Sequence, residues 1–317
     1  MVSRAGRISD SVNETEIDMT KWNLDQMPDQ SDRVAIVTGA NTGIGFETAA
    51  ALAAKGARVV LACRNPQKAE AAVKRILART PAADIAFLGF DLASLAAVHS
   101  FADAFVADYD RLDLLINNAG VMAVPLSHTV DGFELTFGCN HLGHFALTGR
   151  LMDLLVSTPR ARVVTVSSLT HRMGSINFEN LNAEKGYRKM AAYGQSKLAN
   201  LLFHFELDRR LTAAGAMVSA TAAHPGWTRT DLQRHSTAMD FFGFLTQGPA
   251  AGALPTLRAA VDPGAEGGDY FGPRGLFELV GLPQKAGVAA AARSVDDAQR
   301  LWQISEELTG VRYPVLP

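Results

Sequence analysis

The chain has 317 residues, of which 48% are hydrophobic, and its formal net charge is −2. This length and composition allow a large buried core, and the near-neutral mixture of charges argues against a protein that binds nucleic acid or anionic membrane. No apolar run approaches the roughly 20 residues needed to span a bilayer.

The N-terminus and the cysteines indicate the compartment. Residues 1–30 are polar and lack the apolar segment of a signal peptide, so they predict an N-terminal tail in which residues 1–18 are poorly anchored. Cys63 and Cys139 have neither metal-ligand spacing nor a partner pattern, which indicates buried free thiols in a reducing compartment. We therefore expect a cytoplasmic protein with one domain over residues 31–317.

From residue 33 onward, short β-branched runs alternate with longer helical patterns. Strands are expected at 33–38, 57–62, 84–88, 112–116, 162–166 and 217–222, with an edge strand at 270–271. Helices are expected at 46–55, 66–79, 95–108, 131–156, 193–211 and 249–261. This alternation predicts an α/β fold with a doubly wound parallel sheet of the Rossmann type and helices on both faces.

A glycine-rich turn follows the first predicted strand. A strand, a glycine-rich turn and a helix N-terminus can together hold a pyrophosphate through backbone N–H groups. Glycine is needed because a Cβ would block the tight turn or the approach of phosphate. The alternative is an ordinary turn, but the context favours a dinucleotide site. Its predicted residues are Gly39, Asn41, Thr42, Gly43, Ile44 and Gly45.

Ligands of such sheets bind at the carboxyl ends of the strands. The second strand ends in Cys63-Arg64-Asn65 without the acidic residue that binds the ribose hydroxyl of NAD. Arg64 is placed to bind a 2′-phosphate, so we predict NADP rather than NAD; the alternative is an ordinary surface arginine. After the third strand, Asp91 can accept from an adenine amino group or cap the next helix.

Three more strand ends carry small or polar residues. These are Asn117-Asn118-Ala119-Gly120, Ser167-Ser168 and His224-Pro225-Gly226-Trp227-Thr228-Arg229-Thr230. The first of these motifs is small enough to lie beside a bound ribose, or it can stabilise a neighbouring strand.

Tyr193 and Lys197 are four residues apart, so on a helix they share one face. An ammonium beside a phenol favours the phenolate, and acid/base catalysis near neutral pH needs the pKa of tyrosine, about 10, to fall by roughly two to three units. By themselves these two residues are more often a surface pair worth a few tenths of a kcal/mol. The surrounding motifs favour catalysis.

Taken in order, the motifs resemble the short-chain dehydrogenase/reductase family over about residues 32–275. The matching residues are Thr38-Gly39-x-x-x-Gly43-Ile44-Gly45, Asn117-Asn118-Ala119-Gly120, Ser168, Tyr193-x-x-x-Lys197 and Pro225-Gly226-x-x-x-Thr230. Residues 62–65, 139–145, 196–200 and 301–310 are similar to the branch of retinol dehydrogenases and protochlorophyllide reductases, which generally uses NADP.

The resemblance implies that Asn140, Ser168, Tyr193 and Lys197 are catalytic. Tyr193 would be the acid in carbonyl reduction or the base in alcohol oxidation. Lys197 would lower its pKa and bind the nicotinamide ribose, and Ser168 would orient the substrate oxygen. Asn140 would hold a water that passes protons from Lys197 to solvent. Beyond the glycine turn, the implied cofactor residues are Arg64, Asn65, Asp91, Leu92, Asn118, Ala119, Gly120, Tyr193, Lys197, Pro225, Gly226, Thr228 and Thr230.

Two segments are expected to select the substrate. One is the insert of 24 residues between Ser168 and Tyr193, and the other is the loop at about 227–248. The apolar cluster of this loop, at 240–245, is either an amphipathic helix packed on the core or a mobile lid. We predict a hydrophobic ketone, aldehyde or alcohol. We expect no metal, because His141 and His144 have no third ligand at suitable spacing.

Two other functions stay open. A non-catalytic NADP-sensing regulator would be expected to have lost Tyr193, Lys197 or Ser168. A nucleotide-sugar epimerase-type enzyme also uses Tyr-x-x-x-Lys, but the middle glycine of its glycine-rich turn usually comes one residue earlier than Gly43 does here. A homo-oligomer is compatible with the resemblance, in which helices like those containing Asn140 and Tyr193 often pair, although the insert before Tyr193 could obstruct that face.

Overall fold

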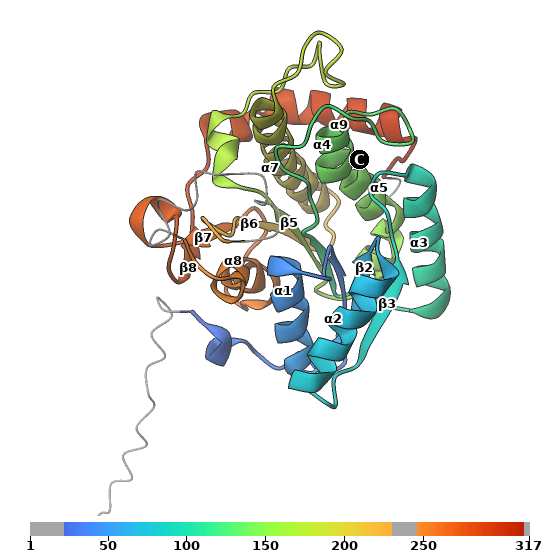
Figure 1. Cartoon of the computed structure of the whole chain (residues 1–317), viewed down its shortest axis with the longest axis vertical. Helices are drawn as coiled ribbons and strands as arrows, with labels where there is room; N and C mark the ends of the chain where they lie inside the picture. The colour runs from blue at the N-terminus through green and yellow to red at the C-terminus, as the bar shows by residue number, and fades with distance from the viewer. Residues whose placement is uncertain (1–21, 230–245, 314–317) are drawn as a thin grey trace, which may run out of the picture.

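The computed structural model describes residues 22–229 and 246–313 (Figure 1). Within these ranges one sheet has the strand order β3-β2-β1-β4-β5-β6-β7-β8, and all neighbours are parallel except β7 and β8. The order reverses between β1 and β4, so the carboxyl ends of these strands open a crevice at a topological switch point. The predicted doubly wound parallel sheet is confirmed.

The predicted elements occur in the predicted order. The strands are β1 (Val34–Thr38), β2 (Arg58–Cys63), β3 (Ile85–Gly89), β4 (Leu114–Asn117), β5 (Arg162–Val166), β6 (Ser219–Ala223), β7 (Tyr270–Pro273) and β8 (Pro283–Lys285). The helices are α1 (Gly43–Ala54), α2 (Pro66–Arg79), α3 (Leu95–Asp108), α4 (Leu135–Phe137), α5 (Gly143–Arg150), α6 (Met152–Ser157), α7 (Lys189–Ala213), α8 (Pro249–Val261) and α9 (Val295–Thr309). Short 3-10 or π turns are η2 (Leu24–Gln26), η3 (Gly138–Leu142), η4 (Leu169–Met173), η8 (Leu276–Glu278) and η9 (Ala290–Arg293).

The side chains of β1 show why helices cover both faces of the sheet. Val34 and Ile36 join one core with residues of α3 and α5, whereas Ala35 and Val37 join the other with residues of α1 and α8. All five residues of β1 are buried. A continuous apolar strand of this kind needs cover on each side.

The single helix predicted for residues 131–156 is wrong. Glu134 caps α4, because its carboxylate accepts from the N–H groups of Thr136 (2.7 Å) and Phe137 (2.8 Å). The chain then passes through the π turn η3 into α5, and a break at Leu151 separates α5 from α6. A π turn inside a helix often marks a functional site, and this one contains Asn140.

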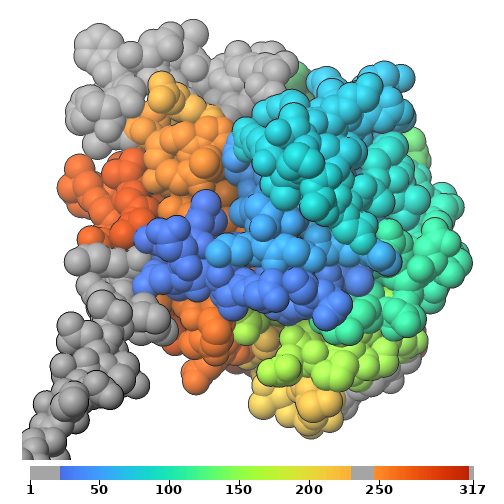
Figure 2. All heavy atoms as spheres, turned by 90° about the horizontal axis from the view of Figure 1, so that it is seen from below, coloured from blue at the N-terminus to red at the C-terminus, as the bar shows by residue number. Residues whose placement is uncertain are grey.

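The edge of the sheet and the N-terminal segment also differ from expectation. The edge position predicted for residues 270–271 is wrong, because β8 pairs antiparallel with β7 and is itself the edge. The tail predicted for residues 1–30 extends too far, since Trp22 and Met27 are buried in the core that contains α1 and α8. Figure 2 shows these first described residues, in dark blue, lying against orange residues from the C-terminal part of the chain.

No helix in the described ranges combines the length and the apolar character needed to cross a membrane.

Candidate active site

A cleft of about 450 Å³ opens where the strand ends meet α7. It is lined by Gly39, Asn41, Thr42, Gly43, Ile44, Gly45, Arg64, Lys68, Asn118, Ala119, Gly120, Val166, Ser167, Tyr193, Lys197 and Pro225. Most predicted cofactor residues are therefore brought together, and Lys68, Val166 and Ser167 were not foreseen. The predicted cofactor residues that do not line the cleft are Asn65, Asp91, Leu92, Gly226 and Thr228, and of the predicted catalytic residues Asn140 and Ser168 do not line it either. Thr230 and the apolar cluster at 240–245 lie outside the described residues.

The glycine turn has the backbone geometry of a phosphate cradle. Gly39 and Gly43 have φ values of +66° and +60°, in the left-handed region that favours glycine. A Cβ on Gly45 would lie 2.5 Å from Nδ2 of Asn118 and 2.6 Å from the carbonyl oxygen of Gly39. Since α1 begins at Gly43 without a side-chain cap, its first N–H groups can bind an anion.

Asn118 holds β1 and β4 together at the floor of the cleft. Its Nδ2 donates to the carbonyl oxygen of Thr38 (2.7 Å), and the Thr38 hydroxyl accepts from the N–H groups of Asn118 and Ala119 (2.9 Å each). Of the two roles considered for this motif, the contacts show the stabilisation of a neighbouring strand.

The α2 end of the cleft carries two cations. Arg64 and Lys68 both line it, and Asn65 between them caps α2 by accepting from the N–H of Lys68 (2.8 Å). Asp91 accepts from the N–H of Ala93 (3.0 Å) and lies outside the cleft wall, so its contacts match the capping alternative.

The opposite end of the cleft contains the predicted catalytic groups. α7 begins at Lys189, one turn earlier than predicted, and presents Tyr193 and Lys197 on one buried face. The side chain of Ser168 lies near the phenol of Tyr193 and lowers its pKa, and the Ser168 hydroxyl accepts from the N–H of Thr170 (3.3 Å). Nζ of Lys197 donates to the carbonyl oxygen of Val166 (3.1 Å) and lies 5.8 Å from the centre of the Tyr193 ring.

Burial sets the protonation of these groups. It raises the pKa of Tyr193 to about 12, against the smaller, opposing effect of the nearby Ser168. It lowers the pKa of Lys197 to about 8. The downward shift expected for the pKa of Tyr193 is therefore wrong for the protein alone, because desolvation of the phenol dominates and the ammonium is directed at Val166.

Asn140 is fully buried and fixes the loop after β4. Its Oδ1 accepts from the N–H of Val121 (2.8 Å), and its Nδ2 donates to the carbonyl oxygen of Val121 (3.0 Å) and to the hydroxyl of Ser196 (2.9 Å). A Cβ on Gly120 would lie 3.0 Å from Oδ1 of Asn140 and 3.6 Å from Nζ of Lys197. Asn140 and Lys197 thus approach each other closely around a glycine.

The remaining polar candidates have structural partners. The Ser167 hydroxyl donates to the carbonyl oxygen of Lys197 (2.7 Å), which leaves Ser168 as the serine beside Tyr193. His141 is hydrogen-bonded to Ser305, and His144 to Thr38 (2.9 Å each). Burial lowers the pKa of these two histidines to about 3 and about 4. The described residues include no group of three or more side chains suited to hold a metal ion.

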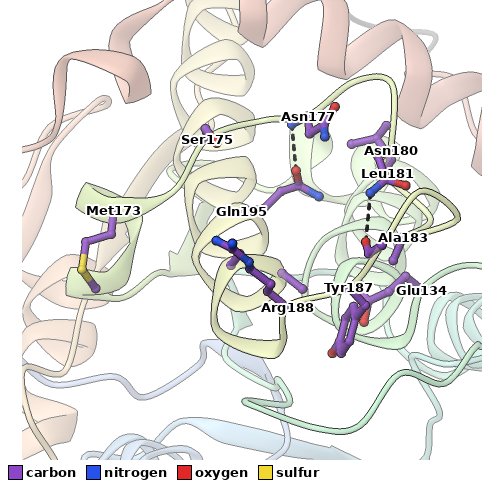
Figure 3. Close-up of a pocket in the computed structure, with 13 residues that line it drawn as sticks. Glu134, Met173, Ser175, Asn177, Asn180, Leu181, Ala183, Tyr187, Arg188 and Gln195 are labelled. Atoms are coloured by element: carbon purple, nitrogen blue, oxygen red, sulfur yellow. Dashed lines mark hydrogen bonds between the residues drawn. The ribbon is translucent and has the colours of Figure 1, made fainter.

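The insert before Tyr193 borders a different hollow, of about 180 Å³ (Figure 3). Ala191 and Gln195 line this hollow and lie two positions from Tyr193 and Lys197, about 200° around the helix. Gln195 accepts from the N–H of Asn177 (2.8 Å), which attaches the insert to α7. The insert therefore packs against α7 beside this hollow.

Comparison with known proteins identifies the family. Residues 33–240 match the family model for short chain dehydrogenase. "Retinol dehydrogenase 11" of Homo sapiens is 43% identical over 285 residues, which are 88% of this chain and 86% of that protein.

The crystal structure of an uncharacterized protein from Mycobacterium Paratuberculosis has a TM-score of 0.78 at 43% identity, covering 93% of this chain and 99% of that chain. A short chain dehydrogenase from Shigella flexneri, complexed with NADP, has a TM-score of 0.63 at 25% identity, covering 78% of this chain and 98% of that chain. The chain belongs to the short-chain dehydrogenase family and is an NAD(P)-dependent oxidoreductase acting on CH–OH groups.

Proposed function

We propose that this protein uses NADPH to reduce a hydrophobic aldehyde or ketone, and catalyses the reverse oxidation when the alcohol is in excess. The observation that carries the proposal is the position of the Tyr193 phenol, near Ser168 and beside the buried ammonium of Lys197. Both Tyr193 and Lys197 line a cleft whose other end has a glycine cradle and two cations. These features fit a nicotinamide dinucleotide.

The residues of the site supply the proton and the orientation. A bound nicotinamide cofactor supplies the hydride, from its C4 atom. The hydroxyls of Ser168 and Tyr193 bind the substrate oxygen between them, so that the carbonyl is held in one orientation. Because burial raises the pKa of Tyr193 to about 12, this phenol carries the proton that carbonyl reduction requires.

Lys197 and Asn140 complete the proton path. The ammonium of Lys197 stabilises the phenolate that Tyr193 becomes, in a dry site where such electrostatic effects are strong. The pKa of Lys197, lowered by burial to about 8, lets it give up a proton near neutral pH. Asn140 holds the loop at Gly120 close to Lys197, and a water bound there would connect Lys197 to solvent.

The cofactor is proposed to be NADP rather than NAD. Arg64 and Lys68 lie at the same end of the cleft, and among the described residues that line it none is acidic. A 2′-phosphate would pair with both cations, whereas the ribose of NAD offers them no charge. The Shigella flexneri structure in complex with NADP supports this choice.

The substrate class is supported by the relatives. Their name, retinol dehydrogenase, points to a lipophilic alcohol and the corresponding aldehyde. A non-catalytic sensing protein is disfavoured, because Tyr193 and Lys197 line the cleft and Ser168 lies near Tyr193. The buried free thiols of Cys63 and Cys139 support the expected cytoplasmic location.

An NADPH-consumption screen tests this function. The substrates are hydrophobic aldehydes and ketones, retinal among them, with sugars as a polar comparison set and Tyr193→Phe as the blank. We expect NADPH to be consumed faster with hydrophobic carbonyls than in the blank, and faster than NADH. Consumption at the blank's rate across the whole set would overturn the proposal.

A further inference from the structure

Glu278 connects the two loops that flank the catalytic end of the cleft. Its Oε2 accepts from Nη2 of Arg172 (2.7 Å) and from Nε2 of His224 (3.2 Å). Arg172 lies in η4, the turn that Ser168 caps, and His224 directly precedes Pro225, which lines the cleft. Glu278 itself lies in η8, between β7 and β8. One carboxylate therefore binds both loops from a third part of the chain.

The ring of His224 carries the link to the backbone of the Pro225–Gly226 turn. His224 is fully buried, and its Nδ1 accepts from the N–H of Gly226 (3.2 Å). Since Nδ1 accepts, the ring proton is on Nε2 and can be donated to Glu278. A Cβ on Gly272 would clash with Nε2 of His224, so this glycine leaves the space that the ring needs.

The serine side of the link is fixed in the same way. The N–H of Ala289 donates to Nε2 of His171 (3.2 Å), so Nδ1 of His171 carries the proton and donates to the carbonyl oxygen of Ser168 (2.6 Å). Arg172 also donates to the carbonyl oxygen of Gly287 (3.2 Å). The C-terminal segment around β8 thus holds the serine loop at several points.

The hairpin between β7 and β8 also holds the base of the loop after β6. The N–H of Trp227 donates to the carbonyl oxygen of Leu279 (2.8 Å), and the N–H of Gly281 donates to Oε1 of Gln247 (3.1 Å). Nε2 of Gln247 donates in turn to the carbonyl oxygen of Pro225 (2.8 Å). Glu278 therefore acts within a hairpin that is already attached to the cofactor side of the cleft.

The backbone at Glu278 is strained, and the packing of its neighbour Phe277 does not offset the strain. Phe277 and Glu278 have φ values of +50° and +61°, a left-handed conformation that costs a non-glycine residue of order 1 kcal/mol or more. Packing of Phe277 does not offset this cost, because its side chain is 78% exposed. The Arg172–Glu278 pair is partly exposed, so it contributes at most about 1 kcal/mol. What the strained turn achieves is the placement of the Glu278 carboxylate.

We propose that Glu278 is a positioning residue for hydride transfer. It keeps the loop of Ser168, which orients the substrate oxygen, in a fixed position relative to the Pro225–Gly226 turn on the cofactor side. This inference rests on the proposed function. Glu278 lies beyond the residues 33–240 that match the family model, so its role is inferred from its contacts alone.

The test compares Glu278→Ala and Glu278→Gln with Phe277→Ala, a matched change in the same strained turn. For each variant, NADPH titration gives the number of binding-competent sites, and kcat is expressed per such site. The same reaction with NADPH deuterated at the transferred position gives the isotope effect. We expect Glu278→Ala to lower kcat about 10- to 100-fold, with a larger isotope effect, an unchanged number of NADPH sites and a KM within about threefold.

The conservative variant and the control complete the comparison. Glu278→Gln should recover part of the rate, because its amide oxygen can still accept a hydrogen bond, and Phe277→Ala should stay within about twofold of the wild type. An unchanged kcat per site in Glu278→Ala, or an equal loss in Phe277→Ala, would overturn the proposal.

Amide hydrogen exchange separates this inference from the proposed function. In Glu278→Ala, but not in Phe277→Ala, exchange should become about 10-fold faster at Gly226 and over residues 169–174. If the wild type reduced no carbonyl compound, the proposed function would fail, but this exchange result would still decide whether Glu278 holds the two loops. Unchanged exchange at both places would overturn the positioning role, whatever the activity.

Discussion

The ammonium of Lys197 lies 5.8 Å from the centre of the Tyr193 ring, on the same buried face of α7. Burial raises the pKa of Tyr193 to about 12 and lowers that of Lys197 to about 8. Both shifts favour the uncharged group. At neutral pH the phenol therefore keeps its proton, while the lysine is close to the point where it gives one up, which suits proton delivery to a carbonyl oxygen.

Replacement of Lys197 should abolish turnover and raise the free energy of unfolding by an amount that depends on pH. The pKa of Lys197 is about 8 in the folded protein and 10.5 ordinarily, so between these values the unfolded chain binds more protons and wild-type stability rises with pH. Lys197→Met should therefore be more stable than the wild type at pH 7, by about 1–3 kcal/mol, with turnover lost. The difference should shrink from pH 8 to 10.5. Urea unfolding across this range measures it, with the exposed Lys74→Met as control; a difference independent of pH would contradict the assignment.

Cofactor choice should depend on Arg64 and, to a smaller degree, on Lys68. Arg64→Ala removes a cation from the end of the cleft where the 2′-phosphate is proposed to bind, so the Kd of NADPH should rise about 10- to 100-fold. The Kd of NADH should stay within about twofold, since NADH lacks that phosphate. Fluorescence titration of both cofactors checks this, with Lys74→Ala on α2, the helix that follows Arg64, as control. Equal loss of both affinities would argue against a phosphate contact.

A methyl group on Gly45 should disrupt the glycine cradle. A Cβ there would lie 2.5 Å from Nδ2 of Asn118 and 2.6 Å from the carbonyl oxygen of Gly39, so α1 or these groups would have to move apart. Gly45→Ala should cost about 1–3 kcal/mol of unfolding free energy and weaken NADPH binding. Gly89→Ala is the control, because no atom lies within 4 Å of its Cβ position. Thermal unfolding and NADPH titration should separate the two variants, and similar behaviour would contradict the close approach.

The C-terminal helix should keep the chain monomeric. Trp302 of α9 stacks 5.8 Å from the ring of Phe203 on α7 and contacts Phe145 of α5 edge-on at 5.1 Å. Since α9 covers part of the face formed by α5 and α7, we expect that a second chain does not pair there in the way that the family resemblance suggested. Sedimentation velocity should give the mass of one chain, and Trp302→Ala should cost about 3–5 kcal/mol. A dimer of the intact chain would contradict this account.

The sequence predicted the sheet, the cleft and its two ends because these depend on local patterns. Each strand from β1 to β6 is an apolar run of strand length, and each crossing helix has its own periodicity. Gly39, Gly43 and Gly45 are placed by turn geometry, and the spacing of Tyr193 and Lys197 by one helical turn. Such features need no knowledge of distant contacts.

The remainder of the site depends on contacts between distant segments. β8 has three residues and becomes a strand only by pairing with β7, so Glu278, in the turn between them, could not be assigned a partner. The capping of α4 by Glu134 and the π turn at Asn140 interrupt a pattern that reads as one continuous helix. The pKa of Tyr193 depends on burial in the folded site, which outweighed the charge that the spacing to Lys197 suggested.

The most direct test of the account is Tyr193→Phe, measured for both NADPH binding and reduction of the carbonyl compound that the screen identifies. The substitution leaves the buried ring and removes only the hydroxyl that holds the proton. NADPH should bind with a Kd within about threefold of the wild type, while the rate of NADPH oxidation at saturation should fall by about 10²- to 10⁴-fold. Turnover at the wild-type rate, with NADPH fully bound, would contradict the assignment of Tyr193 as the general acid.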